Sequence, residues 1–227
     1  MDLLPEIAEL PTEPIARTHT PTPGKWNTYR PCLRLEFEFT CAFCRCHEAE
    51  VVEHGAQGTG LFATEHFHSQ TRFPALANDY DNCFYICRYC NGSKGDDPVQ
   101  ADDGRTLLNP CLAAWNEHFE YDENEFRLEP RTADASYTEE AYRLNVPRKV
   151  NSRRTRFRVI SERTETLKNG PERVKSLTDL LPGIDAEGRR VLFSEILRQR
   201  QAIVNSRRDL ERYLRVPKDA PASCKCP

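Results

Sequence analysis

Two short cysteine motifs restrict this chain more than any other feature. "CAFC" holds Cys41 and Cys44, "CRYC" holds Cys87 and Cys90, and 42 residues separate the two pairs. A C-x-x-C segment aims two thiolates at one ion, and two such segments complete the closed tetrahedral shell of four sulfurs that is typical of structural zinc sites. Such a shell has no open position for a substrate. The spacing therefore predicts a structural Zn²⁺ that holds two distant segments together.

Other cysteines and one histidine lie near these motifs. Cys46 and His47 are close enough in sequence to replace one of the four ligands, so the fourth ligand stays open. A redox function is disfavoured, because two matched pairs flank one segment and no thioredoxin-like βαβ pattern surrounds them. The cysteines outside this region are interpreted as ordinary thiols, buried or at the surface: Cys32, Cys111, Cys224 and Cys226.

The cellular compartment bears on this interpretation, since clustered cysteines in a reducing compartment are more often metal ligands than disulfides. The first residues, "MDLLPEIAELPTEPIARTHTPTPGKW", are acidic and interrupted by proline, without the basic start and apolar stretch of a signal peptide. The chain also has no apolar run of about 18 residues, the length that a membrane-spanning helix needs. We therefore expect a cytoplasmic protein that has no membrane partner.

Proline content and hydrophobic periodicity divide the chain into four parts. We expect an irregular arm over 1–31, an α+β domain with the zinc site over 32–130, a helical and basic region over 131–216, and a disordered tail over 217–227. Charge follows this division: residues 1–130 carry 10 Lys and Arg against 22 Asp and Glu, whereas the rest of the chain carries 22 against 13. The C-terminal half would then hold a polyanion, although solvated arginine-rich helices would give the same split.

Several segments have a recognisable periodicity. "LRLEFEFT" (33–40) alternates apolar and polar residues, which predicts a strand, with a short helix as the alternative. Residues 50–68 predict two short strands around a glycine-rich bend, and "NCFYICRYCNGSKGD" (82–96) predicts a turn and then a short helix. Helical periodicity follows from position 136 and includes a long amphipathic helix over 186–215, whose apolar face packs on the core or on another protein.

Between the two cysteine pairs, carboxylate, imidazole and amide side chains stand at several distinct spacings. The segment "TEHFHSQTRFPALANDYDNCFYICRYCNGSKGD" (64–96) contains Glu65, His66, Asn82 and Asn91. It resembles the HNH endonuclease motif in its zinc-stapled form, with an E-H-F start, a D-Y-D-N loop and a C-x-x-C-N-x-x-K-G-D end. "LLNPC" and "NEHFEY" extend the resemblance, which covers residues 32–121. This group includes HNH nucleases that accompany an ATPase in bacterial antiphage systems such as Septu.

The resemblance implies a ββα-metal fold and hydrolysis of phosphodiester bonds, with DNA favoured over RNA. It makes His66 the general base that deprotonates water. Glu65 and Asn91 would bind one divalent ion, Mg²⁺ or Mn²⁺, both of which prefer oxygen ligands. Asn82 would hold the loop that positions the imidazole, and Lys94 would contact a phosphate near the helix start. The resemblance further implies an ATPase partner and a function in antiviral defence.

Two positions call for separate comment. Many HNH motifs begin with Asp-His, whereas this chain has Glu65, whose longer side chain would shift the ion. His68 stands where the pattern usually has a basic residue, and on a strand it would face the same side as His66. A phosphate contact, an extra metal ligand and a surface position without a role all stay open for His68.

The segment "RKVNSRRTRFRVISER" (148–163) concentrates positive charge. It predicts phosphate contacts without sequence readout, by Arg153, Arg154 and Arg156 in particular. A solvated helix face and a docking surface for an acidic protein are the alternatives. For the whole chain, the second hypothesis is a non-catalytic zinc-finger adaptor that binds nucleic acid or protein, and the third is a toxin-like nuclease silenced by an inhibitor.

Overall fold

The computed structural model describes residues 10–50, 61–95 and 98–214. They fall into two compact units, the first within Ala8–Arg154 and the second within Thr155–Arg215. The architecture combines helices with two small antiparallel sheets, which agrees with the expected mixture of helix and sheet. In the described ranges, no helix has both the length and the apolar character needed to cross a bilayer. The expected tail over 217–227 and the first of the two strands expected over 50–68 lie outside these ranges.

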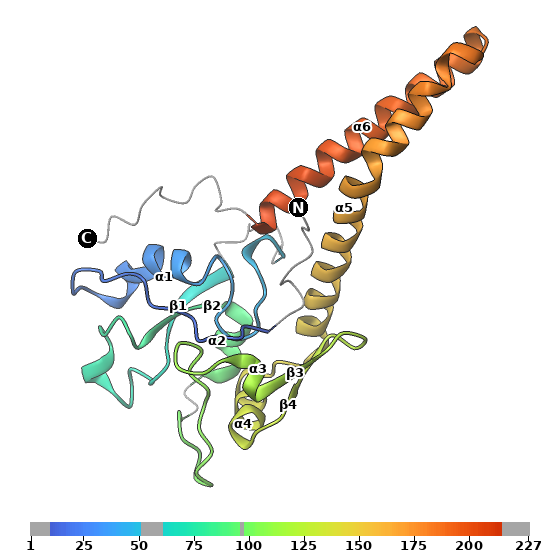
Figure 1. The fold of residues 1–227 in the computed structure, drawn as a ribbon. Coiled ribbons are helices and arrows are strands. Elements are labelled where there is room, and N and C mark those ends of the chain that lie inside the picture. The colour runs from blue at the N-terminus through green and yellow to red at the C-terminus, as the bar shows by residue number, and fades with distance from the viewer. Residues whose placement is uncertain (1–9, 51–60, 96–97, 215–227) are drawn as a thin grey trace. The chain divides into compact units, whose positions relative to one another are not determined.

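The centre of the first unit is a two-stranded hairpin followed directly by a helix. Strand β1 (Phe62–His66) pairs antiparallel with β2 (Cys83–Cys87), in a register that places His66 opposite Cys83. Helix α2 (Arg88–Lys94) begins at the residue after β2 and contacts both strands (Figure 1). Every residue of β2 is buried, so both faces of this strand are covered. The short helix expected before Gly95 is confirmed, whereas β2 was not predicted.

Aromatic side chains pack around the middle of β2. The ring of Phe84 lies 5.7 Å from that of Phe37, 5.9 Å from that of Phe43 and 5.6 Å from that of Phe67, measured between centroids. Phe37 directly follows α1, Phe43 lies inside the first cysteine motif, and Phe67 directly follows β1. Aromatic pairs at such distances add stability beyond the area they bury. The core therefore ties the cysteine-bearing segments to the hairpin.

The strand expected over 33–40 is wrong, and the alternative of a short helix is confirmed. A 3-10 turn, η1 (Trp26–Tyr29), leads into helix α1 (Arg30–Glu36), whose first turn contains Pro31. Proline suits the first turn of a helix because its missing N–H would have no partner there. Residues 10–25 contain neither helix nor strand, whereas η1 and the start of α1 fall within the range of the expected arm, 1–31.

The remainder of the first unit is a second hairpin with helices on either side. Helix α3 (Trp115–His118) leads into β3 (Phe119–Asp122), which pairs antiparallel with β4 (Arg127–Pro130). Helix α4 (Ala133–Tyr142) follows, with the Thr132 hydroxyl accepting the amide of Ala135 at its start. Two further 3-10 turns lie in the loops, η2 (Glu48–Glu50) and η4 (Pro74–Leu76).

The second unit is a helical hairpin. Helix α5 (Pro147–Asp179) starts in the first unit, and the turn η5 (Leu181–Gly183) joins it to α6 (Ala186–Leu214). The expected long amphipathic helix is confirmed as α6. Its apolar face packs on α5: Ile196 is buried, and a Cβ added to Gly170 would lie 2.7 Å from Cγ1 of Ile203. Glycine at position 170 thus permits the close approach of the two helices.

Candidate functional site

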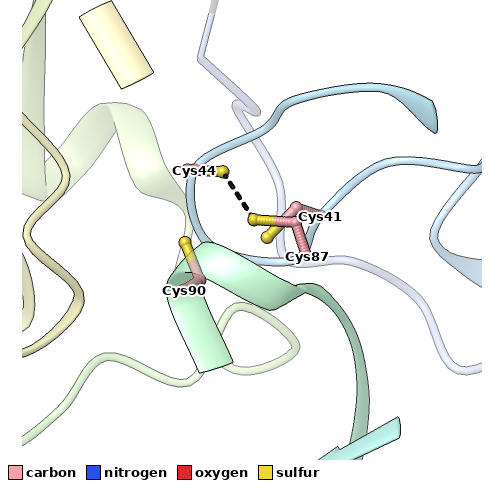
Figure 2. Close-up of side chains that lie close together, drawn as sticks. All are labelled: Cys41, Cys44, Cys87 and Cys90. Carbon is pink, nitrogen blue, oxygen red and sulfur yellow. Dashed lines mark hydrogen bonds between the residues drawn. The ribbon is translucent and has the colours of Figure 1, made fainter. Parts of the chain in front are cut away.

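Four cysteines from the two motifs come together in the first unit. Cys41 and Cys44 lie in the turns after α1, Cys87 is the last residue of β2, and Cys90 lies in the first turn of α2 (Figure 2). Their sulfur atoms all lie within 4.8 Å of one another, and those of Cys44 and Cys87 are 3.6 Å apart. Zn–S bonds of about 2.3 Å in a tetrahedron place sulfurs about 3.8 Å apart. The four buried cysteines are therefore compatible with a structural zinc site.

Backbone geometry explains how the first motif presents its thiols. Arg45 has a φ of 60°, in the left-handed region, and its amide donates to Cys41 O at 3.1 Å. The amide of Ala42 donates to Tyr85 O at 2.9 Å, which attaches the motif to the edge of β2. The tight turn and this attachment place the first cysteine pair beside the second.

The electrostatics of the four thiols favour a cation. Hydrogen bonds from Cys41 and from other neighbouring thiols hold the pKa of Cys44 well below its usual range. Burial, followed by hydrogen bonding to Cys41, raises the pKa of Cys90 well above its usual range. Without a cation, burial therefore opposes ionisation of all four groups together. A divalent ion would supply the charge that stabilises four thiolates in this space.

The alternative ligands take other positions. The sulfur of Cys46 lies 3.3 Å from that of Cys44, but Cys46 does not belong to the group whose sulfurs are all mutually close. The ring of His47 is buried and lies edge-on to Phe39 at 6.4 Å between centroids. The geometry thus selects Cys87 and Cys90 as the second pair.

A buried lysine from α5 lies beside this cluster. Lys149 donates from Nζ to Tyr142 O, and the Tyr142 ring stacks on that of Phe43 at 3.8 Å. Burial alone would lower the pKa of Lys149, but the neighbouring sulfurs of Cys90 and Cys44 keep it above its usual value. With a divalent ion bound by the four cysteines, this ammonium would offset part of the negative charge of the thiolates.

His66 is the last residue of β1 and is 5% exposed. Its Nε2 lies 2.8 Å from Ala77 O. A carbonyl oxygen only accepts hydrogen bonds, so Nε2 carries the proton and, in the neutral ring, Nδ1 carries the lone pair. The Trp26 ring lies edge-on to the imidazole at 5.4 Å between centroids. The imidazole is thus held in one tautomer with Nδ1 as the basic atom.

Asn82 connects the end of β1 to the following loop. Its Nδ2 donates to His68 O at 3.0 Å and to Leu76 O at 3.1 Å, while its Oδ1 accepts the amide of His68 at 2.8 Å. The backbone of Asn82 also takes part, because its carbonyl accepts the amide of Phe67 at 2.9 Å. These bonds fix the loop that carries the Ala77 carbonyl against the strand that carries His66.

Glu65 lies on the other face of β1 from His66. Burial alternates along the strand, and Glu65 is on its less buried side, with 16% of its side chain exposed. Its Oε1 lies 3.5 Å from Nζ of Lys94. Asn91 precedes Lys94 by three positions on α2, and this spacing places both residues on one helix face. Glu65 therefore contacts α2 at Lys94, on the helix face that also carries Asn91.

The expected position of Lys94 near the helix start is wrong. Lys94 is the last residue of α2, its side chain is 0% exposed, and Nζ donates to His66 O at 3.2 Å. A buried ammonium is costly unless it is paired, and here Glu65 and a carbonyl satisfy it. Lys94 consequently holds the end of β1.

The expected alignment of His68 with His66 is also wrong, because β1 ends at His66 and His68 lies in the bend that follows. The ring of His68 lies edge-on to Phe67 at 5.4 Å and to Phe73 at 5.1 Å. Its Nδ1 is buried and makes no hydrogen bond. The side chain of His68 is therefore packed among aromatic rings.

The arginines predicted to contact phosphate divide into different environments. Arg153 is buried, and its guanidinium donates to Phe126 O, Leu144 O and Asn145 Oδ1, which gives it structural contacts within the first unit. Arg154 is exposed, with its guanidinium 5.4 Å from the Phe126 ring. Arg156 lies in the second unit and is partly buried.

Another arginine of the same segment lies close to α2. The guanidinium carbon of Arg148 is 3.7 Å from the centre of the Tyr89 ring, and that of Arg88 is 5.8 Å from the same ring. The basic segment over 148–163 predicted a cluster of positive charge that includes Arg148, but the sequence did not indicate that Arg148 contacts Tyr89 on α2. Trp26 also had no signal beyond being an aromatic residue in a proline-rich arm.

Comparison with protein-family models, with curated proteins and with solved structures found no match for this chain.

Proposed function

We propose that this protein is a metal-dependent endonuclease that hydrolyses phosphodiester bonds, with DNA as the favoured substrate. The observation that carries the proposal is the state of His66. Its Nε2 donates to Ala77 O at 2.8 Å, so the imidazole presents the lone pair of Nδ1. An imidazole that is held in one tautomer and keeps a lone pair on its other nitrogen suits a general base.

The order of elements supports a ββα-metal assignment. β1 and β2 form the hairpin, α2 follows at once, and the cysteine cluster joins the end of β2 to the start of α2. His66 and Glu65 stand at the end of β1, while Asn91 is on α2. In this proposal the zinc ion fixes the helix relative to the strands, so that Glu65 and His66 on β1 and Asn91 on α2 can reach one phosphate.

In the proposed mechanism, Nδ1 of His66 takes a proton from the attacking water. Glu65 and Asn91 offer oxygen ligands to Mg²⁺ or Mn²⁺, which would neutralise charge on the phosphate and on the leaving oxygen. Asn82 acts through the loop, because its bonds to His68 and Leu76 keep the Ala77 carbonyl opposite the imidazole. General bases of this kind accelerate reactions by about 10²- to 10⁴-fold.

The ion pair between Glu65 and Lys94 restricts how a metal ion would bind. Glu65 belongs to no group of three or more histidine, cysteine or acidic side chains that is close enough to hold an ion within the described ranges. The ion would therefore take most of its ligands from Asn91, water and the substrate phosphate, as Mg²⁺ commonly does. We expect weak binding of the ion until nucleic acid is present.

The second unit has a surface that suits the proposed ATPase partner. The outer face of α6 exposes several large apolar side chains, and a shallow depression lies beside them. Arginines border this depression, which favours an acidic protein surface over a second copy of the same basic face. The exposed apolar residues are Val191, Phe193, Leu197 and Val204.

Plasmid cleavage with Mg²⁺ or Mn²⁺ tests the proposed activity. The parent chain is compared with His66→Ala, and His118→Ala provides a matched histidine outside the proposed site, all with equal zinc content. We expect loss of at least about 10² in rate for His66→Ala alone. Equal cleavage by His66→Ala would refute the assigned base, and a companion His68→Ala would show whether that histidine replaces it. Absence of cleavage by a fully zinc-loaded parent, with and without the ATPase, would favour the non-catalytic adaptor.

A further inference from the structure

The N-terminal arm reaches the loop that orients His66. Three consecutive carbonyls of this loop accept hydrogen bonds from three different parts of the first unit. Leu76 O accepts from Asn82 Nδ2 at 3.1 Å, Ala77 O accepts from His66 Nε2 at 2.8 Å, and Asn78 O accepts from the hydroxyl of Tyr29 at 2.9 Å. The resemblance assigns a role to the first two donors only.

The turn η1 makes two further contacts to the same place. The amide of Trp26 donates to Asn78 Oδ1 at 3.1 Å, so the side chain of Asn78 is bonded to the arm as well as its carbonyl. The indole ring of Trp26 lies edge-on to the imidazole of His66, with an angle of 70° between the ring planes. Loop and imidazole are thus both in contact with a turn that precedes them by some 40 to 50 positions in the chain.

The turn itself is anchored, so it can serve as a fixed support. Tyr29 is 1% exposed, and its ring lies edge-on to that of Tyr80 at 5.2 Å. Upstream in the arm, Arg17 donates to Cys83 O at 2.7 Å and to the buried carboxylate of Glu36 at 3.0 Å. The arm is therefore bound to the core on both sides of residues 20–25.

We infer that Trp26 and Tyr29 are positioning residues for the imidazole of His66. Asn82 binds the carbonyl before Ala77, and the turn η1 binds the carbonyl after it. Without the turn, Ala77 O would no longer be kept opposite Nε2, and the imidazole would be free to exchange its proton between the two nitrogens. The inference rests on the proposed function for its catalytic consequence, but the hydrogen-bonded state of His66 is measurable without any substrate.

The variants are Trp26→Ala, which removes the ring against His66, and Tyr29→Phe, which removes the hydroxyl that donates to Asn78 O and accepts the amide of Gly24. Asn27→Ala is the matched control, because Asn27 is exposed and belongs to the same turn. NMR of zinc-loaded protein with ¹⁵N-labelled histidine gives the tautomer of each ring, and a His66→Gln sample assigns the signal of His66. Thermal unfolding of each variant shows that the first unit is folded.

We expect the parent and Asn27→Ala to carry the proton on Nε2, and Trp26→Ala and Tyr29→Phe to show both tautomers. In the cleavage assay we expect kcat to fall by about 10- to 100-fold in these two variants, the scale of misplaced catalytic groups, while KM changes little. Unchanged tautomers in both folded variants would overturn the inference. If the parent cleaves no nucleic acid, the proposed function fails, and the NMR result still decides whether the turn positions the imidazole.

Discussion

Replacing Arg153 with methionine tests whether the basic start of α5 is a structural connection or a substrate surface. The guanidinium donates to Phe126 O at 2.7 Å, to Leu144 O at 3.0 Å and to Asn145 Oδ1 at 3.2 Å. Methionine keeps much of the apolar stem but has no donor. Arg154→Met is the matched control, because Arg154 is the next residue in the sequence and its side chain is exposed.

The expected loss of stability follows from the acceptors that are left behind. An acceptor that loses its partner in a buried position costs about 1–3 kcal/mol. Asn145 Oδ1 keeps the amide of Leu128 as a donor, so only two acceptors lose their partner. Leu144 O loses a buried bond, at about 2 kcal/mol, and Phe126 O loses a partly buried one, at about 1 kcal/mol, so the sum is about 3 kcal/mol. Burial lowers the pKa of Arg153, which shows that the charged group is itself costly to bury and limits the net loss. For Arg154→Met we expect a change within about 0.5 kcal/mol.

Urea unfolding of the zinc-loaded chain measures this difference. Both tryptophans, Trp26 and Trp115, lie in the first unit, so their fluorescence follows that unit and not the helical hairpin. With a denaturant slope of about 1–3 kcal/mol per molar, the midpoint should fall by about 1–3 M for Arg153→Met. A midpoint equal to that of Arg154→Met, combined with weaker binding of nucleic acid, would refute the structural role of Arg153.

Three further predictions concern the first unit. Cys90→Ala should lose zinc and the cooperative unfolding of this unit, whereas Cys111→Ala should retain both, as measured by metal analysis and tryptophan fluorescence. Burial raises the pKa of Cys83 to about 12, so the folded chain keeps a proton that the unfolded chain loses near its ordinary pKa of about 8.5. The contribution of Cys83 to stability is thus complete below about pH 8.5 and declines as the pH rises towards 12. Cys83→Ala should therefore make the urea midpoint fall less steeply with pH over this range; an unchanged dependence of the midpoint on pH would contradict this. Lys94→Met should destabilise the unit by about 1–3 kcal/mol because it removes the ion pair with Glu65 and the donor to His66 O, whereas the exposed Arg72→Met should have little effect; equal midpoints would show that the buried lysine contributes nothing.

Features with a local signal could be predicted from the sequence. The two C-x-x-C motifs predicted the group of four cysteines because each motif places its own thiols close together. The long helix α6 was predicted because an apolar repeat near 3.6 residues fits no other element. Helix α2 was predicted from its glycine and proline stop signals, and it does end just before Gly95.

Residues 33–37 show why period alone was insufficient. Leu33, Leu35 and Phe37 alternate as in a strand, but Leu33 and Phe37 are also four positions apart, which is a helical spacing. In the structure Leu33 and Phe37 are buried while Leu35 is partly exposed. Burial of Leu33 and Phe37 on one helix face therefore outweighs the alternating pattern, which depended on the partly exposed Leu35.

The environments of Lys94 and Arg153 had no signal in the sequence, because their partners are distant in the chain. Lys94 binds the carbonyl of a residue 28 positions earlier, and Arg153 binds the carbonyl of Phe126, 27 positions earlier. Carbonyl partners are present at every residue, so side-chain types do not reveal them. For the same reason, the Ala77 carbonyl opposite His66 could not be predicted from residue types.

The Mg²⁺ dependence of plasmid cleavage by the zinc-loaded chain tests the central claim most directly. Glu65→Gln keeps the size of the side chain but removes its charge, and Glu117→Gln is the exposed control outside the site. The account predicts that the Mg²⁺ concentration for half-maximal rate rises by at least about 10-fold in Glu65→Gln and does not change in Glu117→Gln. Identical Mg²⁺ curves for the parent and Glu65→Gln, or cleavage that persists in EDTA, would contradict metal-dependent hydrolysis at this site.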